Sequence, residues 1–250
     1  MSNSLSTAAD RFLYLHGLNI GDVDGQLGEM KLPGLKAVLE DLTGAISQAE
    51  YMVPNGFVDV SPLSHSGWYT SAMLPYIQRL RAMSTVDRII NWGMEGRSVG
   101  AYAFGMIAMD GKIQPGIEGK QFTKFDAEYP LKRGTVELLK ILEGGTTART
   151  ATGTGTSLDN ATSSSSGAVG YFQGLSVTGT PGSLTGKIAH STDNSTFADL
   201  ITFTAHTTAL AATTSGQRST VTGTVNRYTR AAWTISTFTS TNLFVALKRL

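Results

Sequence analysis

A run of small polar residues divides this chain into two unlike parts. Residues 144–167 read GGTTARTATGTGTSLDNATSSSSG and contain a single large apolar residue. A segment of this composition cannot bury enough apolar surface to form a core of its own. Before it lie all eight Met residues and most of the charges, whereas Thr, Ser, Gly and short apolar alternations follow it. We therefore predict a domain at 1–145, a Gly/Ser/Thr-rich junction at 146–167 and a second domain at 168–250; residues 149–158 are also compatible with a first strand of that second domain.

Composition excludes several classes of function. Of the 250 residues, 41% are hydrophobic, which is enough for a core in each domain. The chain has no Cys, so disulfides, thiolate metal sites and cysteine nucleophiles are excluded. Residues 1–143 hold 13 basic and 16 acidic residues, and residues 144–250 hold 7 and 3, for a net charge of +1. Neither part attracts nucleic acid or membrane by bulk charge. No secretory signal or membrane-length apolar run is evident, so we expect a soluble, intracellularly made protein.

Strand patterns dominate the first domain. In residues 11–20, RFLYLHGLNI, apolar residues occupy both alternating sets, which predicts a strand with two buried faces. Asp110-Gly111 predicts a tight hairpin turn. In residues 121–131 the alternation of polar with apolar residues predicts a strand with one polar face, and three residues form that face: Lys124, Asp126 and Glu128.

One helix and one long arm complete this prediction. Residues 71–83, SAMLPYIQRLRAM, place Met73, Leu74, Ile77 and Leu80 on one helical face, with a proline in the first turn. Further upstream, the run LPGLKAVLEDLTG has apolar residues at helical spacing but is short and bounded by Gly. We interpret it as a long arm or loop.

Regular short strands fill the second domain. Apolar alternations separated by turns recur at 168–177, 184–191, 200–205, 221–225, 228–235 and 243–247. Turn signals lie at Pro181-Gly182 and Asp193-Asn194. This spacing predicts a small antiparallel β-sandwich, so the fold class we expect for the whole chain is mainly β.

The sequence contains no motif that predicts catalysis. The four His residues are isolated, and none has a metal-ligand spacing. Ser64-His65-Ser66 resembles a nucleophile beside its base, but neighbouring strand residues point to opposite faces. The stretch GSLTGK at 182–187 lacks the spacing and the Ser or Thr of a phosphate loop. We predict no catalytic, metal-binding or cofactor-binding residue, and hence no enzyme.

The order of several segments carries a family resemblance. These segments are PLKRGTVELLKIL at 130–142, the junction at 148–159, Tyr171 in a strand, the turn at 191–194, and the ending GQRSTVTGTVNRYTRAAWTI followed by NLFVALKRL within 216–250. In this order they resemble the major tail tube proteins of long-tailed, siphovirus-like bacteriophages with a C-terminal decoration domain.

This resemblance implies a structural virion protein. Its first domain is then a two-sheet β-sandwich or barrel with one flanking helix, and six copies form a ring whose inner sheets join into one barrel. Stacked hexameric rings make the tail tube through which DNA is ejected, and DNA passes non-specifically. Implied partners are the chain itself and the tape measure, terminator and baseplate proteins, with no cofactor and no membrane. The implied location is the virion tail, after assembly in the cytoplasm of the host bacterium.

The resemblance also implies roles for two groups of residues. The polar strand face formed by Lys124, Asp126 and Glu128 is expected to line the lumen, where DNA must slide without sticking. The arm is expected to reach the neighbouring ring through its apolar residues, Leu32, Pro33, Leu35, Val38 and Leu42. Because the second domain is expected to sit outside the tube, deleting residues 167–250 is expected to leave tube formation intact.

Two other functions compete with this interpretation. A head decoration or baseplate protein would use its C-terminal sandwich to bind host-surface glycan, through exposed aromatic residues such as Tyr171, Trp233 or Phe238. Aromatic residues are, however, more often buried in the core. A cell-wall hydrolase would need paired carboxylates or a metal site, and the only acids of the C-terminal half, residues 144–250, are Asp159, Asp193 and Asp199.

Overall fold

Antiparallel β-strands form the described part of the chain in the computed structural model. It comprises residues 12–19, 27–31, 35–41, 52–68, 87–93, 95–109, 111, 113–117, 123–207 and 216–250. The strands are β1 (Phe12–Leu15), β2 (Leu18–Asn19), β3 (Leu27–Lys31), β4 (Leu35–Asp41), β5 (Met52–Val60), β6 (Leu63–Trp68), β7 (Arg88–Gly93), β8 (Tyr102–Ala108) and β9 (Ile113–Ile117). They continue with β10 (Thr123–Tyr129), β11 (Leu131–Gly144), β12 (Gly153–Thr154), β13 (Leu158–Asp159), β14 (Ala168–Ser191), β15 (Ala198–Thr202), β16 (Gly216–Val221) and β17 (Tyr228–Arg249). The prediction of a mainly β protein is confirmed, whereas the helix predicted at 71–83 lies outside the described residues.

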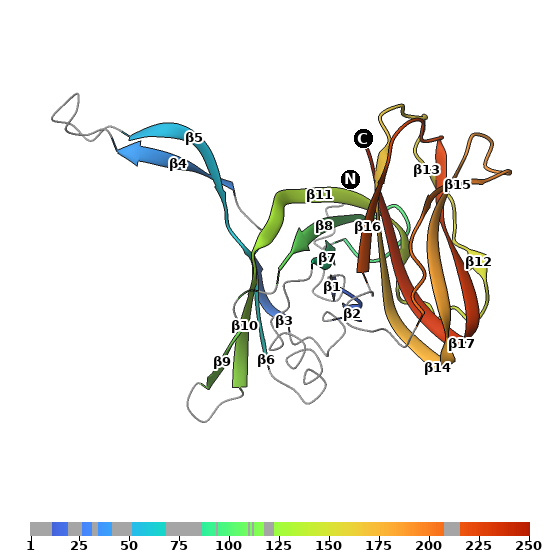
Figure 1. Cartoon of the computed structure of the whole chain (residues 1–250), viewed down its shortest axis with the longest axis horizontal. Coiled ribbons are helices and arrows are strands. Elements are labelled where there is room, and N and C mark those ends of the chain that lie inside the picture. The colour runs from blue at the N-terminus through green and yellow to red at the C-terminus, as the bar shows by residue number, and fades with distance from the viewer. Residues whose placement is uncertain are drawn as a thin grey trace, which may run out of the picture.

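The largest sheet contains strands from both halves of the sequence. Its order is β15-β14-β17-β11-β8-β7-β1-β2, with β16 also paired to β14 and with β12 and β13 paired to β17. The joint between the halves is the antiparallel pair β11–β17, in which Lys140 lies opposite Leu247 and Gly144 opposite Phe244. In Figure 1 the green strands of the first half and the orange and red strands of the second half lie side by side.

This sheet curls until strands far apart in its order meet. The Oε1 atom of Gln173 on β14 accepts a hydrogen bond from the backbone nitrogen of Gly17 at 2.7 Å. The Nε2 atom of Gln173 donates to Oδ1 of Asn91 on β7 at 2.6 Å and to the carbonyl oxygens of Tyr14 and Ile89 at 3.3 and 3.4 Å. Because β17, β11 and β8 separate β14 from β7 in the sheet order, these contacts close the curl. We call strands β16, β14, β17, β11, β8, β7 and β1 the curled sheet.

Alternate residues of the curled sheet fill its interior. The buried cluster consists of Phe12, Tyr14, Ile89, Ala103, Leu139, Ile141, Val169, Tyr171, Phe244 and Ala246. The rings of Phe12, Tyr14 and Phe244 pack with centroids 4.6–5.6 Å apart, and the Tyr14 hydroxyl donates to the Gly144 carbonyl at 2.8 Å. The interior core is therefore built jointly by the first and second halves of the chain.

Two separate layers cover the outer face of the curled sheet. A four-stranded sheet of order β3-β6-β10-β9 packs on one part, with a core of Leu13, Leu15, Leu63, Ile90, Trp92, Met106, Ala108, Ala127 and Tyr129. The other part packs against a second layer made of β15, β12, β13 and the far ends of β14 and β17, with Leu142, Phe172, Leu184, Ile188, Trp233 and Val245 in its core. The curled sheet is thus covered on its outer face by two layers and filled on its inner face by its own side chains.

Strands β14 and β17 belong to two layers because they bend together. They pair from Ala168–Arg249 at one end to Ser191–Tyr228 at the other, with register shifts on both sides of Gly179. Gly179 has a φ of +97°, a conformation that glycine adopts without steric cost. Phe172, before the bend, packs so closely on Gly186, beyond it, that a Cβ atom at Gly186 would lie 2.4 Å from the ring.

The predicted junction at 146–167 is part of the fold. Within it, β12 and β13 pair with β17, and backbone bridges join Arg149 to Thr241 and Ser164 to Val225. Backbone groups of this small, polar segment are therefore hydrogen-bonded to β17 and to the residues just before it, so the segment needs no core of its own. The division into domains at 1–145 and 168–250 stays a prediction, but the two parts share one sheet.

Two hairpins extend beyond the packed layers. The β4–β5 pair forms a separate two-stranded sheet that projects from the body (Figure 1). The β9–β10 hairpin extends from the four-stranded sheet on the same side of the molecule. The prediction of a tight hairpin at Asp110-Gly111 is wrong, because β8 pairs with β7 and β11 whereas β9 pairs with β10 in a different sheet. The Gly111 nitrogen instead donates to the Glu128 carbonyl at 3.1 Å.

Candidate functional site

The predicted arm coincides with the projecting hairpin. Leu35 and Val38 lie on β4, where Leu35 is opposite Val60 and the register shifts between Ala37 and Leu39. Leu32, Pro33 and Leu42 lie outside the described residues. Sequence spacing left the local structure of this run ambiguous, and the structure makes its centre a strand. An isolated two-stranded hairpin is only marginally stable in water, so this projection is suited to a partner surface.

The predicted polar strand is β10, and its alternation is confirmed. Asp126 is exposed and Glu128 is partly exposed, whereas Ala127 and Tyr129 between and after them are buried against the curled sheet. Lys124 lies on the same strand, with its backbone opposite Trp68 and Gly116. The strand therefore presents carboxylates on its outer face and apolar side chains to the core.

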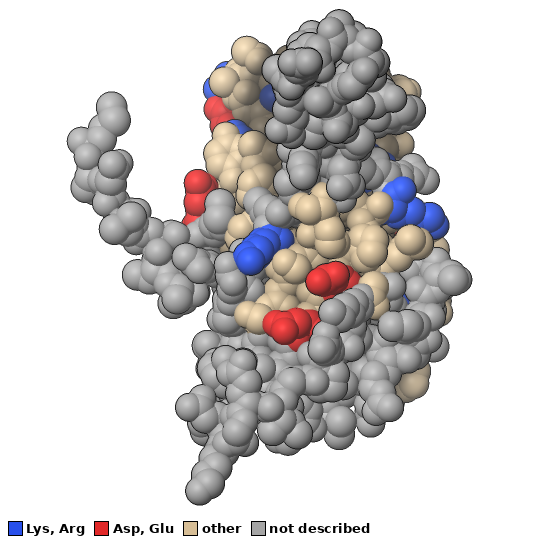
Figure 2. Space-filling model, turned by 90° about the vertical axis from the view of Figure 1, so that its left-hand side faces the viewer, with Lys and Arg blue, Asp and Glu red and all other residues tan. Residues whose placement is uncertain are grey.

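The neighbouring strand β6 extends this polar face. The register places Ser66 opposite Asp126 and Ser64 opposite Glu128. On the side of the molecule from which the hairpin projects, the described acidic and basic side chains lie apart among uncharged ones (Figure 2). No continuous basic track that would hold a polyanion is visible on the described part of this face.

His65 lies on the inner face of β6, away from its two serine neighbours. Its ring stacks on Tyr129 with centroids 5.7 Å apart and lies 3.3 Å from the Tyr129 hydroxyl, measured from Nε2. Burial lowers the pKa of His65 to about 4. Ser64 and Ser66 remain partly exposed on the outer face, so the Ser-His-Ser run does not bring a nucleophile and a base together.

A buried ion pair spans the interior of the curled sheet. Arg218 on β16 donates from Nε and Nη2 to the two carboxylate oxygens of Glu137 on β11, at 2.7 and 2.8 Å. The Tyr171 hydroxyl donates to the same carboxylate at 2.5 Å. Burial alone would raise the pKa of Glu137, but the hydrogen bonds from Arg218 and Tyr171 hold that pKa below its ordinary value. Burial and the hydrogen bond to Glu137 raise the pKa of Tyr171. Both carboxylate oxygens accept hydrogen bonds from protein donors, which indicates a structural pair.

The acids considered for a hydrolase are also engaged. Asp159 receives two hydrogen bonds from Arg227, at 2.6 and 2.7 Å, and these hold its pKa at about 2. Asp193 accepts hydrogen bonds from Ser191 and from backbone nitrogens of its turn, which hold its pKa at about 2. Asp199 pairs with Lys187 at 2.6 Å. Asp159 and Asp193 are therefore not poised as general acids, whose pKa would have to be raised.

The aromatic residues considered for glycan binding are in the cores. Tyr171, Trp233 and Phe238 are buried, with exposed fractions of 1%, 4% and 5%. Trp233 also donates from its indole nitrogen to the Ala151 carbonyl at 2.9 Å. They are therefore inaccessible to a ligand at the surface.

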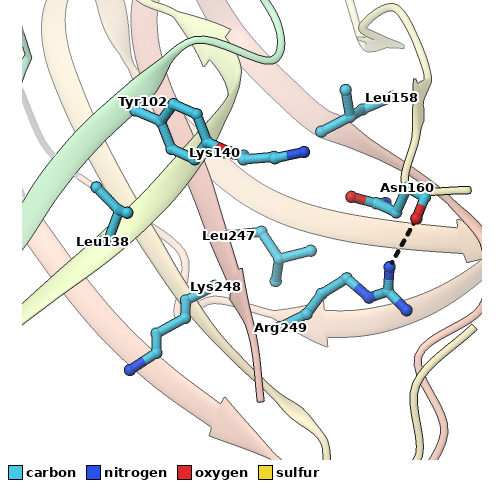
Figure 3. A pocket seen from close by; sticks show the side chains of 8 residues that line it. All are labelled: Tyr102, Leu138, Lys140, Leu158, Asn160, Leu247, Lys248 and Arg249. Atoms are coloured by element: carbon cyan, nitrogen blue, oxygen red, sulfur yellow. Dashed lines mark hydrogen bonds between the residues drawn. The ribbon is translucent and has the colours of Figure 1, made fainter.

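A basic cleft lies between the two layers that cover the curled sheet. It has a volume of about 250 Å³ and is lined by Tyr102, Leu138, Lys140, Leu158, Asn160, Leu247, Lys248 and Arg249 (Figure 3). These residues come from β8, β11, β13 and the C-terminal end of β17, except for Asn160, which directly follows β13. Sequence alternation places Leu138 and Lys140 on one face of β11, but only the arrangement of the covering layers leaves that strip open, so the sequence alone does not reveal the cleft.

His206 is a buried histidine with an expected effect on acid stability. Its ring stacks on Phe172 with centroids 5.1 Å apart, and neither ring nitrogen has a hydrogen-bond partner among the described residues. Burial lowers the pKa of His206 to about 4, whereas an unfolded histidine titrates near 6.5. The unfolded chain therefore binds a proton between these pH values and the folded chain does not.

Replacing this ring is expected to make the protein less sensitive to acid. From pH 6.5 down to pH 4, His206 should cost the wild type up to about 3 kcal/mol of unfolding free energy, and His206→Leu should remove that loss. At pH 7 the variant should be at least as stable, because an unpaired polar ring is replaced by an apolar side chain. Urea unfolding of both proteins between pH 7.5 and pH 4.5 measures the difference. The partly exposed His190 provides the control: if His190→Leu reduced the acid loss as much as His206→Leu, burial of His206 would not be its cause.

Comparison with known proteins leaves the chain without an assigned family. No protein-family model matches the sequence, and no curated protein matches it significantly. Among the described residues no helix is long and apolar enough to cross a membrane, and no group of three His, Asp or Glu side chains is placed to hold a metal ion. Any function for this chain must therefore be inferred from its own residues and geometry.

Proposed function

We propose that this chain is a structural subunit that polymerises as stacked hexameric rings into the tail tube of a long-tailed bacteriophage. The order of sequence segments that resembles major tail tube proteins gives the class of protein. The observation that carries the proposal is the combination, in the described part, of an open four-stranded sheet with a polar outer face and a hairpin that projects from the body.

The four-stranded sheet has the geometry required of a ring-forming element. Its order β3-β6-β10-β9 leaves β3 and β9 as edges within the described part. An open edge presents unpaired backbone groups that invite pairing with another chain, and closing the sheets of several copies into a barrel removes such edges. In the ring, β3 of one copy lies next to β9 of its neighbour, and six such sheets make the inner barrel.

The outer face of this sheet supplies the lumen. Asp126 and Glu128 place carboxylates on it, and Ser64 and Ser66 add uncharged polar groups. Like-charged carboxylates repel phosphates, so DNA passes through non-specifically and without adhering. We place Lys124 on the same face, where it moderates this charge.

The projecting hairpin supplies the contact between rings. Its strands β4 and β5 carry Leu35 and Val38 among many apolar residues, and a hairpin of this composition gains stability by packing on a second copy. We place the flanking helix at 71–83 and the layer formed by β15, β12 and β13 outside the tube. Further partners are the tape measure, terminator and baseplate proteins of the same virion, and assembly takes place in the cytoplasm of the host.

Removing the hairpin is expected to abolish the stacking of rings without unfolding the body. In this variant a short glycine-serine turn replaces residues 37–58, and none of the described core residues lies in this range. Its thermal unfolding midpoint should stay close to that of the wild type, because no described core residue is removed. In sedimentation velocity the wild type should form assemblies larger than one ring as its concentration rises, whereas the variant, which keeps the β3 and β9 edges, should form nothing larger than a single ring.

The matched control carries the same glycine-serine sequence inserted between Ser165 and Ser166, both exposed. It should assemble like the wild type. If the hairpin-deleted variant formed stacked rings at the concentrations at which the wild type does, the arm would be dispensable and its assigned role would be overturned.

A further inference from the structure

An uncovered strip of the curled sheet forms the floor of the basic cleft. On one side of this strip the four-stranded sheet packs on Met106 and Ala108, and on the other side the second layer packs on Leu142. Between them Tyr102 and Leu138 keep 44% and 49% of their side-chain surface exposed. Few large apolar side chains of the described part are this accessible. The cleft therefore offers a ligand an aromatic ring and an aliphatic side chain that other parts of the protein do not cover.

The charges around the cleft are all positive. Lys140, Lys248 and Arg249 line it, and no Asp or Glu is among the lining residues. Arg249 donates to neutral acceptors only, which are the carbonyls of Thr162 and Asn160 at 2.6 and 3.4 Å and the Ser164 hydroxyl at 3.3 Å. Lys140 and Arg249 form no ion pair with a described carboxylate, whereas Lys248 is close enough to Glu137 to favour the charged form of Glu137. Partly desolvated cations without a counter-charge favour an anionic ligand.

The uncharged groups of the cleft suit a hydroxylated ring. The Nδ2 atom of Asn160 donates to the Arg227 carbonyl and the Thr229 hydroxyl, both at 3.0 Å, which fixes the orientation of the amide. Its Oδ1 atom points into the cleft as a free acceptor (Figure 3). The same view shows Tyr102 and Lys140 on the facing wall with Leu247 between the two walls. The Lys140 ammonium lies 5.8 Å from the centroid of the Tyr102 ring, so a ring ligand on Tyr102 would have a cation beside it.

We propose that this cleft binds a sugar ring that carries a carboxylate or a phosphate. Lys140 and Arg249 hold the acidic group, the Oδ1 atom of Asn160 accepts from a sugar hydroxyl, and the faces of Tyr102 and Leu138 pack on the apolar side of the ring. A cavity of about 250 Å³ accommodates one monosaccharide unit. At typical ligand efficiency, a ligand of about 13 heavy atoms binds with a Kd on the order of 1 mM. The site lies apart from the polar sheet face and the hairpin and does not depend on ring formation.

Saturation-transfer NMR on the full chain tests this proposal, because the method works on single chains and on large assemblies. The probes are glucuronic acid, glucose 6-phosphate, neutral glucose and inorganic phosphate. At least one acidic sugar should bind about tenfold more tightly than both glucose and inorganic phosphate, since only the acidic sugars engage both halves of the site. Whichever of the two acidic sugars binds more tightly identifies the acidic group, carboxylate or phosphate, that the cleft prefers.

Substitutions of cleft residues test whether the sugars bind in the cleft. Lys140→Gln should weaken the acidic sugar about tenfold, and Tyr102→Ala should weaken every sugar, with thermal unfolding midpoints unchanged because both side chains are partly exposed. Lys187→Gln, which removes an equivalent charge from the pair between Lys187 on β14 and Asp199 on β15, should have no effect on binding, because neither residue lines the cleft. No acidic-sugar signal at about 20 mM, equal binding of glucose, equal binding of inorganic phosphate, or binding unaffected by Lys140→Gln would each overturn the proposal.

Discussion

A chain that ends at Gly167 is expected not to fold. The truncation removes β14, β16 and β17, which pair with β11 and supply the interior residues Tyr171 and Phe244 of the curled sheet. Phe12, Tyr14, Leu139 and Ile141, all fully buried in the intact protein, would then face water. At about 1.5–3 kcal/mol for each buried side chain, the loss is about 6–12 kcal/mol, comparable with the whole stability of a domain. Circular dichroism and thermal unfolding should show no cooperative transition for residues 1–167.

A nicked protein provides the control for this truncation. A protease site inserted between Ser165 and Ser166 allows the chain to be cut at nearly the same position with nothing removed. The two fragments should stay associated and melt in one transition, because every buried contact is kept. If the truncated chain instead melted cooperatively near the wild-type temperature, the first domain would have a core of its own, as expected from the sequence, and the shared core would be refuted.

Gln173→Leu is expected to lower the free energy of unfolding by about 4 kcal/mol. The side chain is fully buried and makes the hydrogen bonds that close the curl, to the Gly17 nitrogen, to Asn91 and to two backbone carbonyls. Leucine fills a similar volume but leaves these buried groups unpaired, at about 1–3 kcal/mol for each that water cannot reach. Urea denaturation of the wild type and the variant measures the difference.

A Gln→Leu substitution at Gln217, on the neighbouring strand β16, serves as the control. It distinguishes loss of the contacts that close the curl from a general loss of amide hydrogen bonds. Gln217 on β16 accepts from the Thr204 nitrogen and donates to its carbonyl, at 2.8 and 2.7 Å, but these groups are exposed. Gln217→Leu should therefore cost less than about 1 kcal/mol, because water replaces the lost partners. Equal effects of the two substitutions would contradict a closing role for Gln173.

The alternation of residue types along the sequence predicted which side chains of β1 and β10 lie on the same face of the strand. In β1 the sequence placed apolar residues on both faces, and the structure buries Phe12 and Tyr14 inside the curled sheet and Leu13 and Leu15 outside it. In β10 Asp126 and Glu128 face outward, as predicted. These predictions succeed because side chains alternate across a strand whatever the strand pairs with.

Long-range pairing could not be predicted in the same way. The sequence indicated separate strands at 168–177 and 184–191 with a turn at Pro181-Gly182, but the chain bends there without leaving its partner β17. The polar stretch at 146–167 was interpreted as a junction because composition does not show that another strand will satisfy its backbone groups. The shared interior core follows from these pairings and is invisible to local patterns.

The candidate sites differ in how far the sequence predicts them. The polar face of β10 and the arm follow from residues close together in the chain. The basic cleft combines Tyr102, Lys140, Asn160 and Arg249 from separate strands and loops, and depends on where two covering layers stop. The aromatic residues that are candidates for ligand binding from the sequence, such as Trp233, lie in the cores instead. Burying a large ring stabilises the folded protein more than leaving it exposed to water.

Negative-stain electron microscopy of the purified full-length chain tests the proposed function most directly. At high concentration the protein should form sixfold rings, or tubes of stacked rings with an axial channel. A chain that remains monomeric at every concentration, both alone and with tail-initiation partners, would contradict the account.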